Sequence, residues 1–234
     1  MPFPVQWKRY QECLCACPEI GLTLDYSRMD CPDEFFARME GAAAGAFEAM
    51  RILEAGAIAN PDEKRMVGHY WLRNPEKAPD PMLRDDIKAT VVAVKKFARA
   101  VHAGKVKPPR ARRYTKLLVI GIGGSALGPQ FVSRALGTTK DRMQVFFFDN
   151  TDPDGLDVVL SQIAGAGAGL KDTLAVVISK SGGTKETRNG MLEAGAAWKK
   201  AGLTFARQAV AITKSGSNLD AVAVKQEWIA RFPM

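Results

Sequence analysis

Two glycine-rich stretches, GIGGSALG at residues 121–128 and SKSGGTKET at residues 179–187, carry hydroxyl groups that could bind an anion. Each follows an apolar run and opens a helical pattern, so free backbone N–H groups and the positive end of a helix dipole would point at whatever occupies the loop. Hydroxyl groups and a lysine add donors and charge. Together they predict a socket for the tetrahedral anion of a phosphate monoester. The residues predicted to form it are Ser125, Ser179, Lys180, Ser181 and Thr184.

The two stretches can hold one phosphate only if the strands that precede them are neighbours. In the flavodoxin-like strand order 2-1-3-4-5, strands 1 and 3 flank the topological switch point, and the loops at their carboxyl ends face each other across one crevice. Ser125, which we predict to cap its helix, then lies on one side of the phosphate. Ser179, Ser181 and Thr184 lie on the other side, with Lys180 beside them.

Other interpretations of these loops stay open. Gly121, Gly123 and Ala126 fit the G-x-G-x-x-A pattern of a dinucleotide-binding loop, and Asp149 stands at about the distance expected for the acid that binds a ribose hydroxyl. The loops could also be plain turns from strand to helix, whose hydroxyls serve only as helix caps. The chain contains no Walker A pattern, and the spacing fits no metal site.

Four short apolar runs, rich in β-branched and aromatic residues, predict the strands that position these loops. They lie at residues 116–123, 144–150, 173–180 and 207–214. Runs this continuously apolar suit a parallel sheet buried on both faces, and helical patterns at 125–136 and 184–201 lie between them. The alternation predicts an α/β fold over residues 111–234, a doubly wound, mainly parallel sheet with helices on both faces. A last helix is expected over 218–232.

The sequence of residues 1–110 predicts an N-terminal arm followed by a helical segment. The first 32 residues are punctuated by prolines and show no clear periodicity, so we expect a loosely structured arm. Apolar residues then recur at helical spacing from Asp33, which could cap the first helix, to about residue 59. Two further helices are predicted, over 61–72 and over 81–102.

Composition and charge narrow the function. Of 234 residues, 47% are hydrophobic and 25% charged, as in ordinary globular proteins. The net charge of +8 favours an anionic partner: nucleic acid, an acidic membrane or a phosphorylated metabolite. No apolar stretch reaches the roughly 18 residues that cross a bilayer, and the N-terminus lacks the apolar core of a signal peptide. We therefore expect a cytoplasmic protein that binds no membrane.

A basic run at 105–116 holds six basic residues and no acid, which could bind nucleic acid. Single-stranded nucleic acid also needs stacking aromatic groups, and only Tyr114 is available. Because Pro108 and Pro109 lie near its centre, we interpret the run as a solvated connector and expect no nucleic-acid partner.

Cysteines are the remaining candidate metal ligands. Cys13, Cys15 and Cys17 alternate, with Cys31 further on, whereas a zinc site normally shows pairs spaced by two to four residues. We interpret all four as reduced thiols and predict no metal.

Five segments, which cover most of residues 55–234 in family order, resemble the phosphosugar isomerase (SIS) domain, and specifically the glucose-6-phosphate isomerase family of the bacterial type. They are IANPDEKRMVGHYWLR, LLVIGIGGSALGP, FFFDNTDPDGLD, VVISKSGGTKETRNGM and AVAITKSGSNLD. The resemblance implies that a sugar phosphate is held by Gly124, Ser125, Ser179, Ser181 and Thr184, with Lys180 beside it. It also implies interconversion of glucose 6-phosphate and fructose 6-phosphate through an enediol, with an acid opening the ring and a carboxylate moving a proton between C1 and C2. It implies no metal or organic cofactor, and a homodimer in the full-length family.

The chain departs from this family because family members continue well beyond residue 234. The glutamate base, the ring-opening histidine, the C-terminal lysine and a Gly-Gly-Arg segment are not found, so we expect a truncated N-terminal portion that includes the first SIS domain and holds no catalytic residue. His69 and His102 are predicted to be structural or solvent-facing, and Glu186 to stabilise a helix start. These 234 residues alone are expected to turn over little or no substrate.

Three functions remain to be separated: the isomerase, a non-catalytic sugar-phosphate-binding SIS module, and a nucleotide-binding dehydrogenase fragment. A regulatory sensor would be expected to carry a DNA-reading module such as a helix-turn-helix. The first hundred residues resemble the helical segment of the isomerase instead, which favours the isomerase.

Overall fold

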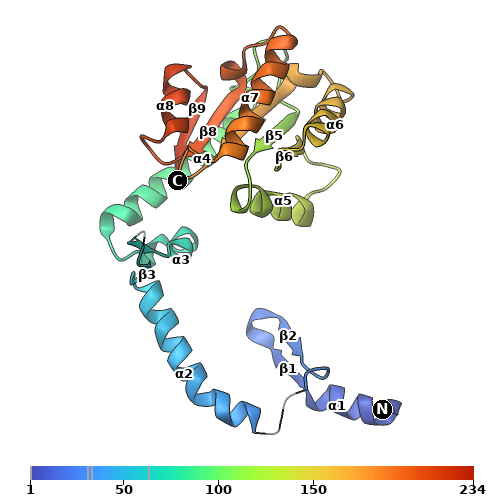
Figure 1. The fold of residues 1–234 in the computed structure, drawn as a ribbon, viewed down its shortest axis with the longest axis vertical. Helices are drawn as coiled ribbons and strands as arrows, with labels where there is room; N and C mark the ends of the chain where they lie inside the picture. The colour runs from blue at the N-terminus through green and yellow to red at the C-terminus, as the bar shows by residue number, and fades with distance from the viewer. Residues whose placement is uncertain (1, 31, 33, 63) are drawn as a thin grey trace. The chain divides into compact units, whose positions relative to one another are not determined.

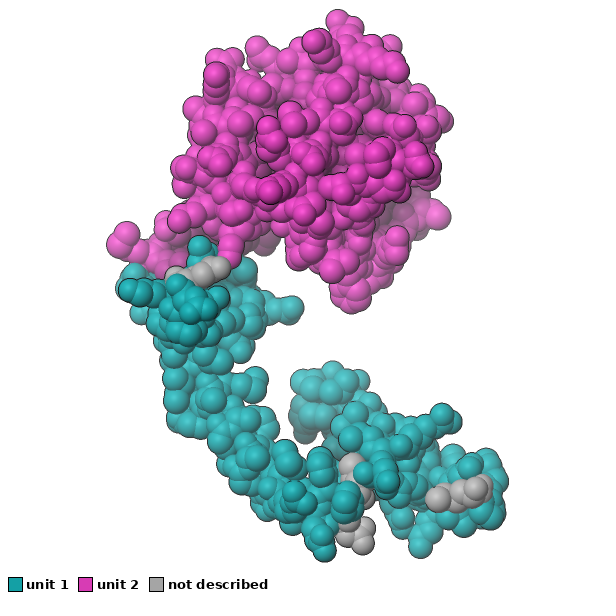
Figure 2. Space-filling view, viewed as in Figure 1, with its two compact units in different colours: residues 1–81 teal, residues 82–234 magenta. Residues whose placement is uncertain are grey.

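The computed structural model describes residues 2–30, 32, 34–62 and 64–234. The chain forms two compact units, Met1–Pro81 and Met82–Met234, which Figure 2 colours separately. The second unit contains both glycine-rich stretches. Along the described ranges, no helix is long and apolar enough to cross a membrane.

Five parallel strands form the sheet of the second unit (Figure 1). They are β5 (Lys116–Ile120), β6 (Gln144–Phe148), β7 (Thr173–Ile178), β8 (Ala209–Thr213) and β9 (Ala230–Pro233). Their order across the sheet is β6-β5-β7-β8-β9, which is the order 2-1-3-4-5 when the strands are counted along the chain. The strands before the two glycine-rich loops are therefore neighbours, as predicted, and Ile120 on β5 pairs with Val177 on β7.

Helices cover both faces of this sheet, which confirms the predicted α/β class. They are α4 (Pro81–His102), α5 (Gly124–Leu136), α6 (Pro153–Ala164), α7 (Lys185–Lys200) and α8 (Asn218–Lys225). Successive side chains of a strand point to opposite faces. Leu118 and Ile120 of β5 pack with α6, α7 and α8 in one cluster, while Leu117 packs with α4 in a second cluster. Because both faces are buried, the strands are continuously apolar in sequence.

The segment predicted as one helix over 218–232 is instead a helix and a strand. After α8, Glu227 takes a positive φ of 54°, and the backbone N–H of Ile229 then donates to β8 at 3.2 Å. The resulting strand, β9, places Phe232 against Phe97 of α4, with ring centroids 5.5 Å apart. The helix prediction is wrong because this contact joins segments far apart in the chain, which local spacing does not reveal.

The first unit consists of one long helix, α2 (Phe35–Glu54), and several shorter elements, with little burial. They are α1 (Phe3–Glu12), β1 (Leu14–Cys17), the 3-10 helix η1 (Pro18–Ile20), β2 (Leu22–Asp25), α2 (Phe35–Glu54), β3 (Ile58–Asn60), β4 (Arg65–Met66), α3 (His69–Arg73) and the 3-10 helix η2 (Pro75–Lys77). Within the part of this unit that the structure describes, Trp71 is the one buried apolar side chain.

Two predictions for the first unit are wrong. The loosely structured arm is a helix followed by an antiparallel hairpin of β1 and β2, and Gly21 permits the turn by adopting a φ of +65°. The helix expected over 61–72 is a second hairpin, β3 and β4, followed by α3, because Lys64 adopts a positive φ that breaks a helix. The helices expected from Asp33 and over 81–102 are confirmed as α2 and α4, although Asp33 itself lies outside the described residues.

The compact units divide at Pro81, so α4 belongs to the unit that contains the sheet. Packing explains this assignment, because Val101 of α4 is buried with Leu174 of β7. Tyr114, the aromatic residue of the basic run, is buried in the same cluster, so its ring cannot stack on a base. A functional division into residues 1–110 and 111–234 stays a prediction.

Candidate anion-binding site

The loops after β5 and β7 meet at Gly121. A Cβ atom built on Gly121 would lie 2.9 Å from the Cβ of Ser125 and 3.2 Å from the carbonyl oxygen of Ile178. The first turn of α5 and the end of β7 therefore approach this glycine so closely that a side chain here would push them apart. Glycine at 121 is what lets the two loops share the carboxyl edge of the sheet.

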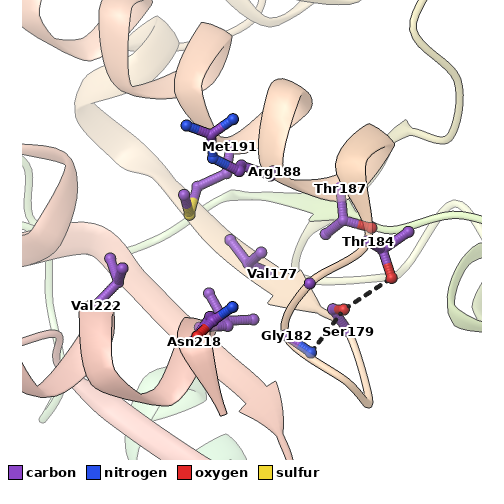
Figure 3. Close-up of a pocket in the computed structure, with 11 residues that line it drawn as sticks. Val177, Ser179, Gly182, Thr184, Thr187, Arg188, Met191, Asn218 and Val222 are labelled. Atoms are coloured by element: carbon purple, nitrogen blue, oxygen red, sulfur yellow. Dashed lines mark hydrogen bonds between the residues drawn. The ribbon is translucent and has the colours of Figure 1, made fainter.

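Ser179 is the most tightly held of the predicted site residues. Its side chain is buried, and its hydroxyl lies 3.1 Å from the Thr184 hydroxyl and accepts the Gly182 N–H at 3.1 Å, as the dashed lines in Figure 3 mark. Its carbonyl accepts the Thr213 hydroxyl at 2.6 Å. These bonds fix the β7–α7 loop and bring two of the predicted hydroxyls together.

Lys180 and Ser181 lie at the exposed tip of the same loop. The Ser181 hydroxyl accepts the Gly183 N–H at 3.2 Å, and the Lys180 carbonyl accepts the Lys214 N–H at 3.2 Å. The backbone of the tip is thus fixed by neighbouring chain, while both side chains stay accessible to a ligand.

The prediction that Ser125 caps its helix is wrong. Gly123, with a φ of +56°, occupies the N-cap position of α5, and Gly124 opens the helix. Ser125 is half-buried in the first turn, where its N–H donates to the Ile122 carbonyl at 3.2 Å. The helix begins two residues earlier than expected, with its N-cap at Gly123 instead of Ser125, so Ser125 lies inside the first turn.

Side-chain caps distinguish the helices of this unit. Asp152 caps α6 by accepting hydrogen bonds from the backbone N–H groups of Asp154 and Gly155, and Ser217 caps α8 by accepting one from the N–H of Asp220. By contrast, Gly123 before α5 and Thr184 before α7 make no side-chain cap bond. The interpretation of the loop hydroxyls as mere caps is therefore wrong for the two helices that begin at the predicted socket. At the start of α5 the N–H groups of Ser125 and Ala126 donate instead to the backbone carbonyls of Ile122 and Gly123.

A third loop, between β8 and α8, supports the site and was not predicted to do so. The hydroxyls of Thr213 and Ser217 lie 2.7 Å apart, and a Cβ on Gly182 would lie 2.6 Å from the Ser217 hydroxyl. Its sequence, TKSGS at residues 213–217, repeats the Lys-Ser-Gly of the second loop at residues 180–182. That internal similarity was the available signal.

A cavity of about 300 Å³ extends from the β7–α7 loop between α7 and α8 (Figure 3). Of the six predicted residues, Ser179 and Thr184 line it, whereas Gly124, Ser125, Lys180 and Ser181 do not. Val177, Met191 and Val222 give it an apolar wall, and Arg188 and Asn218 lie at its sides. Its described lining contains no carboxylate and no imidazole, the groups that proton transfer would need.

The remaining candidate acids and bases are held elsewhere. Glu186 is exposed in the first turn of α7, the position that favours an acid at a helix start. His102 is exposed at the end of α4, and His69 is exposed with its ring 4.1 Å from that of Tyr70. The Asp149 carboxylate accepts the side-chain amide of Gln130 at 2.6 Å, so the acid expected for a ribose hydroxyl is already hydrogen-bonded.

The cysteines form no metal cluster in the ranges the structure covers. Cys13 is half-buried, and Cys15 and Cys17 are exposed on β1, while Cys31 lies outside the described residues. Nor do the described histidines, cysteines and acids form any group of three or more that could hold a metal ion.

A parallel sheet in the order 2-1-3-4-5, with helices on both faces, defines a doubly wound α/β protein, and two helices without side-chain caps begin at its switch point. The phosphoglucose isomerase family model matches residues 25–232. The chain belongs to the phosphoglucose isomerase family.

Relatives and solved structures agree with this assignment. Glucose-6-phosphate isomerases of Geotalea daltonii and Geobacter sulfurreducens are 59% and 61% identical over 228 residues, which is 97% of this chain. The crystal structure of a glucose-6-phosphate isomerase from Chlamydia trachomatis matches 97% of this chain with a TM-score of 0.78 and 27% identity, and 43% of that chain is covered. The chain spans 42% and 43% of the length of the two curated relatives.

Proposed function

We propose that this chain supplies the phosphate-binding part of an enzyme that interconverts glucose 6-phosphate and fructose 6-phosphate. The observation that carries this proposal is the contrast in helix caps. α6 and α8 are capped by side chains, while α5 and α7, which begin at neighbouring hydroxyl-bearing loops, are not. Because the chain belongs to the phosphoglucose isomerase family, the anion that would bind where these side-chain caps are missing is a sugar phosphate.

In this proposal the phosphate lies at the carboxyl edge of β5 and β7. Ser125 donates from α5, and the hydroxyls of Ser179, Ser181 and Thr184 donate from the second loop. Hydrogen bonds to an ionised acceptor are stronger than those between neutral groups, so the Ser179 and Thr184 hydroxyls can exchange their mutual contact for the ligand. Gly124 lets the backbone approach the anion, and Lys180 adds positive charge.

Proton transfer through an enediol requires a positioned base, which contributes a factor of about 10² to 10⁴ to the rate. The cavity beside Ser179 offers no carboxylate or imidazole among its described lining residues. We propose that these groups come from parts of the longer relatives that this chain does not match, so the 234 residues alone turn over little substrate. The homodimer, the cytoplasmic location and the absence of a cofactor stay predictions.

Ligand-induced stabilisation tests the proposed function. Fructose 6-phosphate at about 100 times its dissociation constant is expected to raise the unfolding temperature of the chain by about 5 °C, because it binds only the folded form. Fructose without the phosphate and NAD are expected to leave it unchanged, and a Thr184→Val variant is expected to lose most of the shift. Stabilisation by NAD but not by the phosphosugar would reject the isomerase in favour of the dehydrogenase.

A further inference from the structure

The proposed function leaves a strongly basic surface unexplained. From residue 87 to residue 140 the chain holds twelve lysines and arginines and no aspartate or glutamate. Lys95, Lys96 and Arg99 of α4, with Lys105 just after it, line a shallow hollow of about 650 Å³. We call this surface the basic hollow.

The basic hollow lies away from the anion-binding site. The last turn of α4 packs near the amino end of the sheet, because Val101 is buried in one cluster with Leu174, the second residue of β7. Arg142, which precedes β6, donates to the His102 carbonyl at 3.2 Å and so brings another cation to this end. The glycine-rich loops follow the carboxyl ends of β5 and β7, and none of their residues lines the hollow.

Structural roles do not account for these cations. In the described part of the chain, no carboxylate lies within ion-pair distance of the four cations that line the hollow, Lys95, Lys96, Arg99 and Lys105. Favourable interaction of cations with the carboxyl end of a helix is confined to its last turn. Arg99 lies in that turn, but Lys95 and Lys96 precede it. A concentration of unpaired positive charge attracts an anionic partner.

The apolar part of the lining, here called the floor, indicates which class of anion fits. It consists of Val92, which is 64% exposed, Ala100 and Ala103, and the four cations form the rim. Its described lining residues include no aromatic side chain, so single-stranded nucleic acid would find no stacking platform. A bare phosphate chain would leave the apolar floor uncovered. An acidic peptide that also carries an apolar side chain would pair its carboxylates with the cations of the rim and cover the apolar floor with its apolar side chain.

We propose that the basic hollow binds an acidic segment of a partner protein. Lys95 and Arg99 are four residues apart and Lys96 and Arg99 three apart, so the three cations lie on one face of α4 and can each meet a carboxylate. An apolar side chain of the partner, placed between its acids, covers Val92. Complementary charge speeds association, and the apolar contact lengthens the lifetime of the complex.

Fluorescence anisotropy with labelled peptides tests this proposal on the full chain. The probes are a Glu-Glu-Leu repeat, a Glu-Glu-Ser repeat of equal length and charge, and a single-stranded oligodeoxynucleotide of equal length. The leucine peptide is expected to bind about tenfold more tightly than the serine peptide, because it buries apolar surface on the floor. The oligonucleotide is expected to bind more weakly than the leucine peptide.

Variants distinguish peptide binding at the basic hollow from attraction by the net charge of the chain. A Lys95→Glu/Arg99→Glu variant is expected to bind the leucine peptide at least tenfold more weakly, and Val92→Ser to remove the preference for leucine over serine. Lys199→Glu/Lys200→Glu, which changes the charge equally at the exposed end of α7, serves as the matched control and is expected to bind normally. If the double reversal does not fold, Lys96→Ala/Arg99→Ala replaces it.

Three results would overturn the proposal: equal binding of the two peptides, tighter binding of the oligonucleotide, or an equal loss in the α7 control.

Discussion

The Asp172→Ala variant is expected to lose about 3–5 kcal/mol of its free energy of unfolding, because the ammonium group of Lys116 would remain buried without its carboxylate partner. Lys116 is 2% exposed, and its Nζ lies 2.5 Å from the Oδ1 of Asp172. The second carboxylate oxygen accepts the Thr115 hydroxyl at 2.5 Å. The pair joins the start of β5 to the turn before β7, the two strands that precede the glycine-rich loops.

Chemical denaturation of the parent and the variant measures this effect. Asp157→Ala, which removes an exposed acid on α6, is the matched control and is expected to change the free energy of unfolding by less than about 0.5 kcal/mol. A Lys116→Met/Asp172→Leu double variant is expected to recover most of the loss, since an apolar pair leaves no buried charge. A loss below about 1 kcal/mol for Asp172→Ala would show that Lys116 finds another partner or water.

The same ion pair predicts a dependence on pH. Burial opposes ionisation of Asp172, but the hydrogen bonds from Lys116 and Thr115 and the charge of Lys116 outweigh it, so its pKa lies below the ordinary 3.8. A lowered pKa means that the unfolded chain binds more protons. The stabilisation is therefore present above the ordinary pKa and is lost as the pH falls through the lower pKa of the folded chain. This acid-dependent loss should be absent in Asp172→Ala.

The Gly182→Ala variant is expected to bind fructose 6-phosphate about 10 to 100 times more weakly than the parent. Gly182 has a φ of +68°, which costs a residue with a Cβ about 1–2 kcal/mol. Its Cβ would also lie 2.6 Å from the Ser217 hydroxyl and 2.8 Å from the Leu219 nitrogen, so the loop must move. Movement breaks the Gly182 bond that orients Ser179 and separates the donors from the phosphate.

Gly183→Ala is the matched control for this variant. Gly183 has no positive φ, and a Cβ there would meet only the Ser181 hydroxyl at 3.9 Å. Isothermal titration should therefore give nearly the parent affinity for Gly183→Ala. Equal losses in the two variants, or none in Gly182→Ala, would show that the shape of this loop does not govern phosphate binding.

Sequence patterns predicted the elements whose signals are local. The four apolar runs correspond to β5, β6, β7 and β8, because a strand buried on both faces has an uninterrupted apolar sequence. The strand order followed from the general rule for switch points, once two loops with similar chemistry were recognised. The end of α8 at Lys225, shortly before the positive φ of Glu227, could not be predicted, because β9 gains its stability from β8 and from α4.

The candidate site was predictable in its residue types but not in its geometry. Spacing placed Ser179 and Thr184 in one loop, and the structure shows their hydroxyls 3.1 Å apart. The absence of side-chain caps before α5 and α7 is visible only in three dimensions, because serine and threonine are also ordinary capping residues. The supporting role of Ser217 was not predicted, although the Lys-Ser-Gly motif shared by residues 180–182 and 214–216 was visible in the sequence, because only the structure shows that Ser217 lies against Gly182.

A crystal structure of the chain soaked with fructose 6-phosphate tests the shared phosphate socket most directly. The account predicts phosphate oxygens within hydrogen-bonding distance of the hydroxyl of Ser125 on α5 and of Thr184 before α7. A phosphate held by only one of these loops, or bound elsewhere on the chain, would contradict it.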